Sequence, residues 1–310
     1  MSAMTPSQPP MSRRQAWGLA IRPRTLPAAV GPVLVGTGLA VADGAFRPLP
    51  ALAALAAALL LQVASNLAND YYDFVKGYDQ ADRQGPTRVA LSGLISLQEL
   101  RGGLILVLAI TALIGLYLIA VGGWPILALG LAAMISAVLY SGGPYPLAAH
   151  GLGELFVFIF FGLAAVAGTY YVQALHLPPV VLLAALPSGS LVTAILVVNN
   201  LRDIEVDRRV GKDTLAVRLG PQGTRLEYAI LLAVAYLVPA GLLMAGLVGW
   251  GDPGLASPWV LLPWLSLPMA WRLARLVYTI EMGPAMNRIL AGTAQLSLVF
   301  SVLFAVGLAL

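Results

Sequence analysis

Apolar residues occur in long runs along this chain, separated by short polar segments that hold most of the charge. A helix needs about 20 mainly apolar residues to cross a bilayer, and segments of roughly that size recur nine times. They cover about residues 25–42, 50–69, 104–121, 124–140, 152–172, 178–200, 227–249, 257–275 and 290–310. The fourth is short, and the eighth contains Pro263 and Pro268. The pattern predicts an all-α polytopic membrane protein with about nine transmembrane helices.

Composition supports a membrane protein and excludes several classes of site. Of the 310 residues, 59% are hydrophobic and only 10% are charged, whereas soluble domains carry about 25% charged residues. The chain has no cysteine, which excludes disulfides, thiolate metal sites and cysteine nucleophiles. The basic pI near 9.5 follows from membrane topology, so we expect no nucleic-acid partner.

The distribution of basic residues predicts the orientation, because cytoplasmic loops carry an excess of lysine and arginine. With nine spans, 17 of the 18 lysines and arginines fall on the side of the N-terminus, and only Arg47 falls on the other. We therefore expect a multi-pass protein of the inner (cytoplasmic) membrane with a cytoplasmic N-terminus. Residues 1–310 would form one domain, with a cytoplasmic tail over 1–20 and long cytoplasmic loops over about 70–103 and 201–226.

Two polar motifs stand at the cytoplasmic ends of apolar spans. In the first motif, residues 66–83, Asn66, Asn69, Asp70 and Asp73 have the spacing i, i+3, i+4, i+7, which places them on one helical face. In the second motif, residues 199–218, a similar face is formed by Asn199, Asn200, Asp203 and Asp207. In each motif a glycine, Gly77 or Gly211, follows the last of these aspartates by four positions. The two motifs form a quasi-repeat.

The residue types in these motifs indicate a magnesium and diphosphate site. Clustered carboxylates repel one another unless positive charge lies between them. Carboxylate and amide oxygens suit Mg²⁺, which takes one or two carboxylates together with substrate phosphates. Basic residues would supply the further positive charge that a diphosphate needs: Lys76, Arg83, Arg88, Lys212 and Arg218. Two such faces opposed across a cavity would form a diphosphate clamp.

The motifs resemble those of the UbiA superfamily of intramembrane prenyltransferases. The resemblance rests on NDYYD (69–73) and NNLRDIEVD (199–207), and further matches extend over essentially the whole chain. IRPRTLPAAVGPVLVG (21–36), YSGGPYP (140–146), HGLGE (150–154), GKDTLAVRLG (211–220) and NRILAGTAQ (287–295) look most like the MenA branch, which prenylates 1,4-dihydroxy-2-naphthoate. Gly77 stands where the hydroxybenzoate branch commonly has a third aspartate.

The resemblance implies nine helices around one cavity open to the cytoplasm. It also implies transfer of a polyprenyl group from a polyprenyl diphosphate to 1,4-dihydroxy-2-naphthoate, with loss of diphosphate and CO₂, to give demethylmenaquinol in menaquinone synthesis. The cofactor would be Mg²⁺, and the partners would be the two substrates and the lipid bilayer. The length of the isoprenoid chain, the oligomeric state of the protein and the general base of the reaction stay undetermined.

Roles for individual residues follow from the motifs and the resemblance together. Metal ligands would be Asn69, Asp70, Asp73, Asn199, Asp203 and Asp207, of which the four aspartates, with Tyr140, count as catalytic. Diphosphate oxygens would be bound by Lys76, Arg83, Lys212 and Arg218. Second choices for metal or substrate are Asn66, Asp79, Asp82, Asn200 and Ser141. Arg22 or Arg24 would hold the acceptor carboxylate or only enforce topology, and Tyr140 could equally be an interfacial tyrosine.

Two alternatives stay open from the sequence. One is a related prenyltransferase that acts on hydroxybenzoate, homogentisate or another aromatic acceptor. The other is a membrane solute or ion transporter, which would also have many spans and internal similarity. Transporter sites lie near the bilayer midplane on broken helices, whereas both motifs here lie at span ends on one side, which favours the enzyme.

Overall fold

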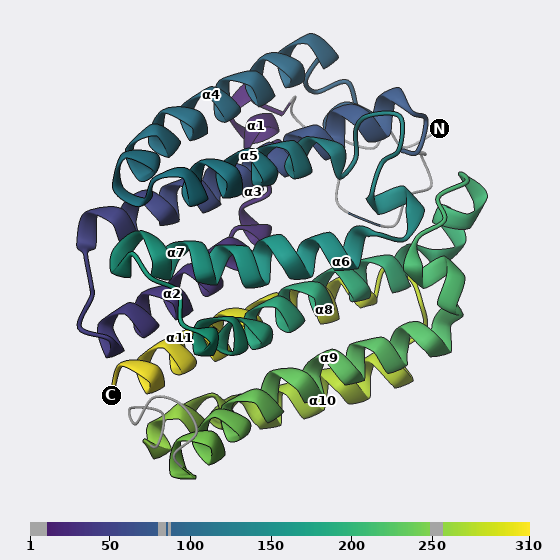
Figure 1. The fold of residues 1–310 in the computed structure, drawn as a ribbon. Coiled ribbons are helices and arrows are strands. Elements are labelled where there is room, and N and C mark those ends of the chain that lie inside the picture. Colours follow the sequence, from purple (N-terminus) through teal and green to yellow (C-terminus); the bar gives the residue numbers. More distant parts are fainter. Residues whose placement is uncertain (1–10, 80–84, 86–87, 249–256) are drawn as a thin grey trace, which may run out of the picture.

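The apolar segments form long helices that lie side by side (Figure 1). The structure, a computed structural model, describes residues 11–79, 85, 88–248 and 257–310. Its α-helices are α1 (Arg13–Ile21), α2 (Pro27–Ala42), α3 (Pro48–Val75), α4 (Leu97–Gly122), α5 (Trp124–Leu139), α6 (Gly153–Val157), α7 (Ala165–Ala174), α8 (Pro179–Arg209), α9 (Leu215–Leu247), α10 (Leu267–Thr279) and α11 (Met286–Ala309). The 3₁₀ segments are Pro23–Thr25, Ala148–His150 and Pro258–Ser266, and Phe158–Ala164 is π-helical. All regular structure in the described residues is helical, which confirms the all-α part of the predicted fold class.

Seven helical stretches within the described residues are long and apolar enough to cross a membrane. An eighth results if α1 and α2, which are bent by 46° at their junction, count as one span. Helix α5 coincides with the fourth predicted span but is a shorter apolar helix. The count of nine spans therefore stays a prediction.

Local sequence explains where several helices begin. Ser12 and Ser96 each cap a helix and form capping boxes with Gln15 and Glu99, and Thr214 caps α9. Proline occupies the first turn of α2, α3, α5, α8 and α10, where its missing N–H is not needed.

The bend between α1 and α2 is held by a polar side chain from α3. Arg22 ends α1 in the left-handed region, with φ 54°, which leaves backbone groups without helical partners. The Asn66 side-chain amide donates to the Ile21 carbonyl at 2.9 Å and to Thr25 Oγ1 at 3.0 Å. The Gln62 side-chain amide, one turn earlier on α3, donates to the side-chain oxygen Asn66 Oδ1 at 3.2 Å. Asn66 thus fixes the path of the chain around Arg22.

Helix α8 is the central helix of the bundle. In its most apolar 18-residue stretch, 67% of the residues are buried, a larger share than in any other candidate span of the described residues. It packs against α9, α11, α2 and the π-helical segment, and the largest cluster of buried apolar residues joins α2, α7, α8, α9, α10 and α11. A second cluster joins α1, α3, residues 89–95 and the start of α4. The two motifs therefore lie at the ends of helices from two different packing clusters, α3 and α8.

The fifth predicted span, about residues 152–172, is one continuous helical stretch with a π-helical segment in its middle. α6, the π-helical segment and α7 continue one another, so residues 153–174 form one span. Gly162, within the π-helical segment, lies against Gly189 of α8 so closely that a Cβ at Gly162 would overlap the Gly189 backbone. This glycine pair lets the span approach the central helix.

Candidate active site

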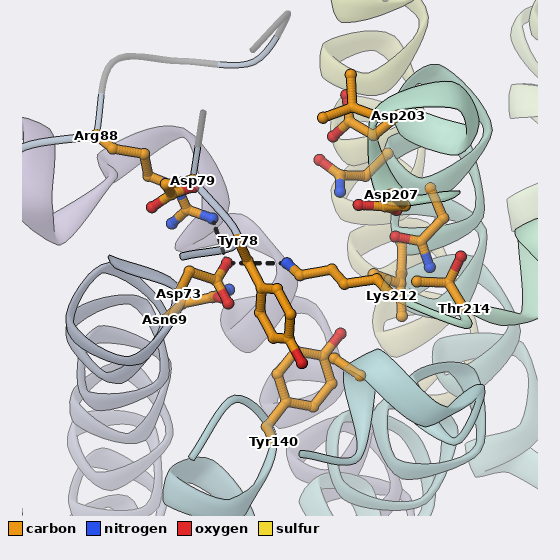
Figure 2. Close-up of a pocket in the computed structure, with 15 residues that line it drawn as sticks. Asn69, Asp73, Tyr78, Asp79, Arg88, Tyr140, Asp203, Asp207, Lys212 and Thr214 are labelled. Atoms are coloured by element: carbon orange, nitrogen blue, oxygen red, sulfur yellow. Dashed lines mark hydrogen bonds and ion pairs between the residues drawn. The ribbon is translucent and has the colours of Figure 1, made fainter. Parts of the chain in front are cut away.

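Both motifs contribute to one cavity at the ends of α3 and α8 (Figure 2). The cavity lies where the apolar helices give way to polar turns, and it has a volume of about 80 Å³. The residues that line it are Asn69, Asp73, Tyr78, Asp79, Arg88, Tyr140, Ala148, Leu196, Asn199, Asn200, Asp203, Val206, Asp207, Lys212 and Thr214. Two polar faces that are far apart in the sequence therefore meet at one site.

In the first motif, three aspartates gather around one buried arginine. The Arg88 guanidinium contacts Asp70 through Nη1, Asp73 Oδ2 through Nη2 at 3.1 Å, and Asp79 Oδ1 through Nε at 3.3 Å. The carboxylate of Asp70 also binds Arg22. Arg22 thus contacts the first motif, and its predicted role toward an acceptor carboxylate stays a prediction.

The position of Asp79 depends on the turn after α3. Gly77 has φ 71°, a conformation that glycine adopts without steric cost. The chain reverses there, so the backbone N–H groups of Tyr78 and Asp79 bind the Asp73 carbonyl at 2.8 and 3.4 Å. The turn brings the Asp79 side chain beside Arg88, even though Asp79 lies beyond the end of the helix.

In the second motif, the corresponding face of α8 is held by Arg202. Its Nε and Nη2 bind the two carboxylate oxygens of Asp203, and Nη2 also donates to Asn199 Oδ1 at 2.9 Å. Nη1 donates to Asn287 Oδ1 on α11 at 2.6 Å. The side-chain amide of Asn200 turns instead to Glu154 Oε1, at 2.7 Å. Asn199, Asp203 and Asp207 line the cavity.

Lys212 joins the two halves of the site. Gly211 has φ 78°, and the Lys212 N–H returns to the Asp207 carbonyl at 2.9 Å, which directs the lysine back over the cavity. Its Nζ lies 3.2 Å from Asp73 Oδ2 and 4.8 Å from the centre of the Tyr78 ring. Figure 2 shows Lys212 crossing from the second motif to Asp73. The side chain that crosses the cavity is therefore a cation placed between two acidic faces.

Tyr140 and Ser141 contact the site from the end of α5. Ser141 Oγ donates to Asn69 Oδ1 at 2.9 Å, and Tyr140 lines the cavity directly. A tyrosine phenol is neutral and keeps its proton at physiological pH.

Other residues predicted for the site point elsewhere or cannot be placed. Lys76 Nζ donates to the Gly143 carbonyl at 2.7 Å, and Arg218 binds Asp213 and the His150 carbonyl at the surface. Asn66 holds the α1–α2 bend, and Arg24 is exposed. Asp82 and Arg83 lie outside the described residues.

The charges at the site nearly balance. Among the described residues, five carboxylates are present, from Asp70, Asp73, Asp79, Asp203 and Asp207. Four cationic side chains, from Arg22, Arg88, Arg202 and Lys212, contact Asp70, Asp73, Asp79 and Asp203. In the part of the chain that the structure describes, no group of three or more His, Cys, Asp or Glu side chains could hold a metal ion. The oxygen donors nevertheless fit Mg²⁺ bound together with a diphosphate, because such a site needs only one or two protein carboxylates.

Sequence reasoning missed or under-used four residues here. Arg88 was named only as general positive charge, although it contacts three aspartates. Tyr78, Thr214 and Arg202 received no role. The signal for Arg202 was its place inside the second motif, next to Asp203, at a depth where a charge must be paired. Gly77 is a sequence signal for a turn after α3, but nothing in the sequence shows that this turn carries Tyr78 into the cavity.

Comparisons with known proteins agree with this architecture. The family model of the UbiA prenyltransferase family matches residues 29–279. A relative from Haemophilus influenzae (strain ATCC 51907 / DSM 11121 / KW20 / Rd), named 1,4-dihydroxy-2-naphthoate octaprenyltransferase, is 37% identical over 94% of this chain and 95% of its own length. A relative of the same name from Escherichia coli (strain K12) is 42% identical over 72% of this chain and 74% of its own.

The fold is shared with a solved structure of much lower sequence identity. A UbiA homolog from Archaeoglobus fulgidus, solved bound to GPP and Mg²⁺, has a TM-score of 0.67 at 18% identity, over 95% of this chain and 100% of its own. Because the family model covers most of the chain and relatives of substantial identity span nearly all of it, this protein belongs to the UbiA prenyltransferase family.

Proposed function

We propose that this protein transfers a polyprenyl group from a polyprenyl diphosphate to 1,4-dihydroxy-2-naphthoate, releasing diphosphate and CO₂ and forming demethylmenaquinol. The proposal draws its acceptor from the relatives named 1,4-dihydroxy-2-naphthoate octaprenyltransferase. The observation that carries it is the cavity in which two carboxylate and amide faces meet around Lys212 and Arg88.

Residues of the two motifs would bind the leaving diphosphate, and aromatic residues would face the reacting carbon. Of the six proposed metal ligands, Asp70 is the one that does not line the cavity. Mg²⁺ would be held by Asn69, Asp70, Asp73, Asn199, Asp203 and Asp207, and when bound it would neutralise the charge that develops on the leaving diphosphate. Among the described residues, Lys212 and Arg88 are the cations that line the cavity, and they would bind diphosphate oxygens. We do not extend this role to Lys76 and Arg218, whose cationic groups are engaged outside the cavity.

Aromatic side chains would protect the allylic cation once the diphosphate has left. Tyr140 and Tyr78 both line the cavity, and the π-face of an aromatic ring attracts a cation. A neutral Tyr140 phenol is suited to this task, because it offers a π-face without presenting a nucleophilic phenolate to the cation. The Arg22 guanidinium, which binds Asp70, is placed beside the first motif and could also meet the acceptor carboxylate.

The membrane arrangement forms part of the proposal. We propose one domain over residues 1–310, nine spans, a cavity open to the cytoplasm, and a multi-pass location in the inner membrane with the N-terminus inside. The distribution of lysine and arginine supports this orientation.

Purified full-length protein in lipid nanodiscs, supplied with Mg²⁺ and a labelled prenyl diphosphate, tests the activity directly. The acceptor panel contains 1,4-dihydroxy-2-naphthoate, 4-hydroxybenzoate and homogentisate, and products are analysed by mass. We expect a prenylated, decarboxylated product from the naphthoate alone. Turnover of another acceptor in its place would overturn the acceptor assignment, and no turnover with any acceptor would overturn the enzyme.

A further inference from the structure

The one buried cation of the second motif connects the active-site face of α8 to the last helix. Arg202 has a side chain that is only 1% exposed, and its contacts run to Asp203, Asn199 and Asn287. Asn287 opens the NRILAGTAQ stretch near the start of α11, a sequence pattern for which the proposed reaction has no use. The contact between Arg202 and Asn287 therefore joins an unexplained motif to the site.

Burial on this scale requires that the arginine be well paired. A guanidinium cannot lose its proton in a protein, and an unpaired buried charge is costly. Arg202 uses its Nε, Nη1 and Nη2 groups in four hydrogen bonds, of 2.8 and 2.5 Å to Asp203, 2.9 Å to Asn199 and 2.6 Å to Asn287. The arginine is therefore locked in one orientation by α8 and α11 together.

The contacts leave the two active-site residues able to bind a ligand. A carboxylate has about four lone-pair sites and an amide oxygen has two, so Asp203 and Asn199 keep acceptor capacity after Arg202 has bound them. Among the described residues, both line the cavity, whereas Arg202 does not. Arg202 thus lies behind the oxygens that face the cavity.

We propose that Arg202 and Asn287 are positioning residues, in which α11 holds Arg202, and Arg202 holds the oxygens of Asn199 and Asp203 in the orientation that binds the metal and the diphosphate. This inference rests on the proposed function, since it takes Asn199 and Asp203 to face those ligands. Planarity is essential to the role, because only a guanidinium can bind both carboxylate oxygens and two amides at once.

The variants Arg202→Lys, Asn287→Ala and Asn287→Asp test the proposal in full-length protein. Lysine keeps the positive charge at residue 202 but loses the planar set of N–H donors that the guanidinium provides. Alanine removes the acceptor on α11, and aspartate restores an acceptor oxygen at the same place. The matched controls are Arg208→Lys, an exposed arginine on the same helix that binds Glu205, and Arg288→Gln, an exposed neighbour of Asn287.

Three measurements separate positioning from folding alone. They are calorimetric titration of Mg²⁺ in the presence of inorganic diphosphate, the Mg²⁺ concentration that gives half-maximal turnover, and the thermal unfolding midpoint. For Arg202→Lys and Asn287→Ala we expect both Mg²⁺ affinities to weaken by roughly tenfold or more, the effect of losing one hydrogen bond to a charged group. Saturating Mg²⁺ should restore most of kcat, Asn287→Asp should stay within about threefold of wild type, and the controls should match wild type.

The outcomes distinguish this inference from the function on which it rests. If wild-type protein turns over while Arg202→Lys and Asn287→Ala bind Mg²⁺ and diphosphate as tightly as wild type, the positioning role is wrong and the enzyme stands. The role is also wrong if Asn287→Asp is as weak as Asn287→Ala, since the acceptor oxygen would then not matter. If wild-type protein neither binds diphosphate nor turns over, the proposed function itself fails.

Discussion

At the scale of single residues, the aspartates of this site differ in the number of cationic side chains with which they form ion pairs. Asp73 Oδ2 accepts both Arg88 at 3.1 Å and Lys212 at 3.2 Å, so one oxygen joins the two halves of the cavity. Asp70 is bound by two arginines, and Asp203 is bound by Arg202. Substitution of Asp73 should therefore be the most damaging change at the first motif.

For Asp73→Asn we expect kcat to fall by about 100-fold or more, a loss typical of removing one electrostatic contact from a catalytic site. Product formation at saturating substrates measures it. Asp213→Asn is the matched control, because Asp213 lies on the second loop but pairs with Arg218 at the surface. If Asp73→Asn keeps activity within threefold of wild type, the catalytic role assigned to Asp73 is wrong.

Two lysines with the same predicted role should behave differently. For Lys212→Met we expect the KM for the prenyl diphosphate to rise by roughly tenfold or more, because a charged hydrogen-bond donor to the substrate is lost. For Lys76→Met, whose Nζ serves the Gly143 carbonyl, we expect a KM close to that of wild type. Steady-state kinetics of the pair measure the difference, and equal effects would contradict the division of roles drawn from the cavity.

At the scale of elements, the sequence predicts helices well and the breaks between them poorly. Each of the nine apolar segments coincides with a helix or a continuous helical stretch. The hydropathy pattern predicts them because a long apolar run indicates both the burial and the length of a helix. The bend at Arg22 and the π-helical Phe158–Ala164 were not foreseen. Asn66 contacts the bend, and Gly189 lies against the π-helical segment; the local sequence shows neither contact.

The same limit applies to the candidate site. The spacing of Asn69, Asp70 and Asp73 predicts that they share one helical face. The quasi-repeat predicts that the second motif forms the other half of the site. The partners of these residues could not be predicted, because Arg88, Lys212 and Asn287 reach the site through turns and tertiary packing. Lys76 and Arg218 show the converse: their sequence positions suit a diphosphate, yet packing directs their cationic groups to backbone carbonyls at Gly143 and His150.

The turn at Gly77 is an element whose geometry can be tested. For Gly77→Ala we expect a loss of about 1 kcal/mol in the free energy of unfolding, because an L-residue is strained at φ 71°, together with weaker Mg²⁺-dependent turnover as Asp79 shifts. Gly102→Ala is the control: it lies in α4 with open space around it, so alanine should stabilise the helix by roughly 0.5–1 kcal/mol. Unfolding in mild detergent compares them, and a Gly77→Ala variant as stable and active as wild type would contradict the argument.

At the scale of the whole molecule, the near balance of charge at the site bears on the order of binding. Among the described residues, five carboxylates and four cations leave little net charge to attract Mg²⁺ alone. We expect calorimetry to show weak Mg²⁺ binding that strengthens when inorganic diphosphate is added. We also expect EDTA to stop turnover and Mg²⁺ to restore it. Equal Mg²⁺ affinity with and without diphosphate would refute the cooperative binding, and turnover in EDTA would refute the metal requirement.

Topology can be tested because the chain has no cysteine of its own. Phe46 and Ser92 are both exposed and lie at opposite ends of the bundle in the predicted arrangement. In intact cells, a membrane-impermeant maleimide should label Phe46→Cys and leave Ser92→Cys unlabelled, and inverted vesicles should give the reverse pattern. The opposite pattern would place the active site outside the cell.

The pairing of each acidic motif within its own half of the chain has a consequence for biogenesis. A chain synthesised only as far as Val89 already contains Arg22 and Arg88, the arginines that bind Asp70, Asp73 and Asp79. Asp203 has its partner as soon as it is synthesised, because Arg202 directly precedes it in the chain. Asp70, Asp73, Asp79 and Asp203 can therefore each pair with an arginine of their own half of the chain as that half enters the membrane, which avoids the cost of unpaired charges in lipid. Among the described contacts, Lys212 joins the two motifs through Asp73, and it is synthesised after the aspartates of both motifs.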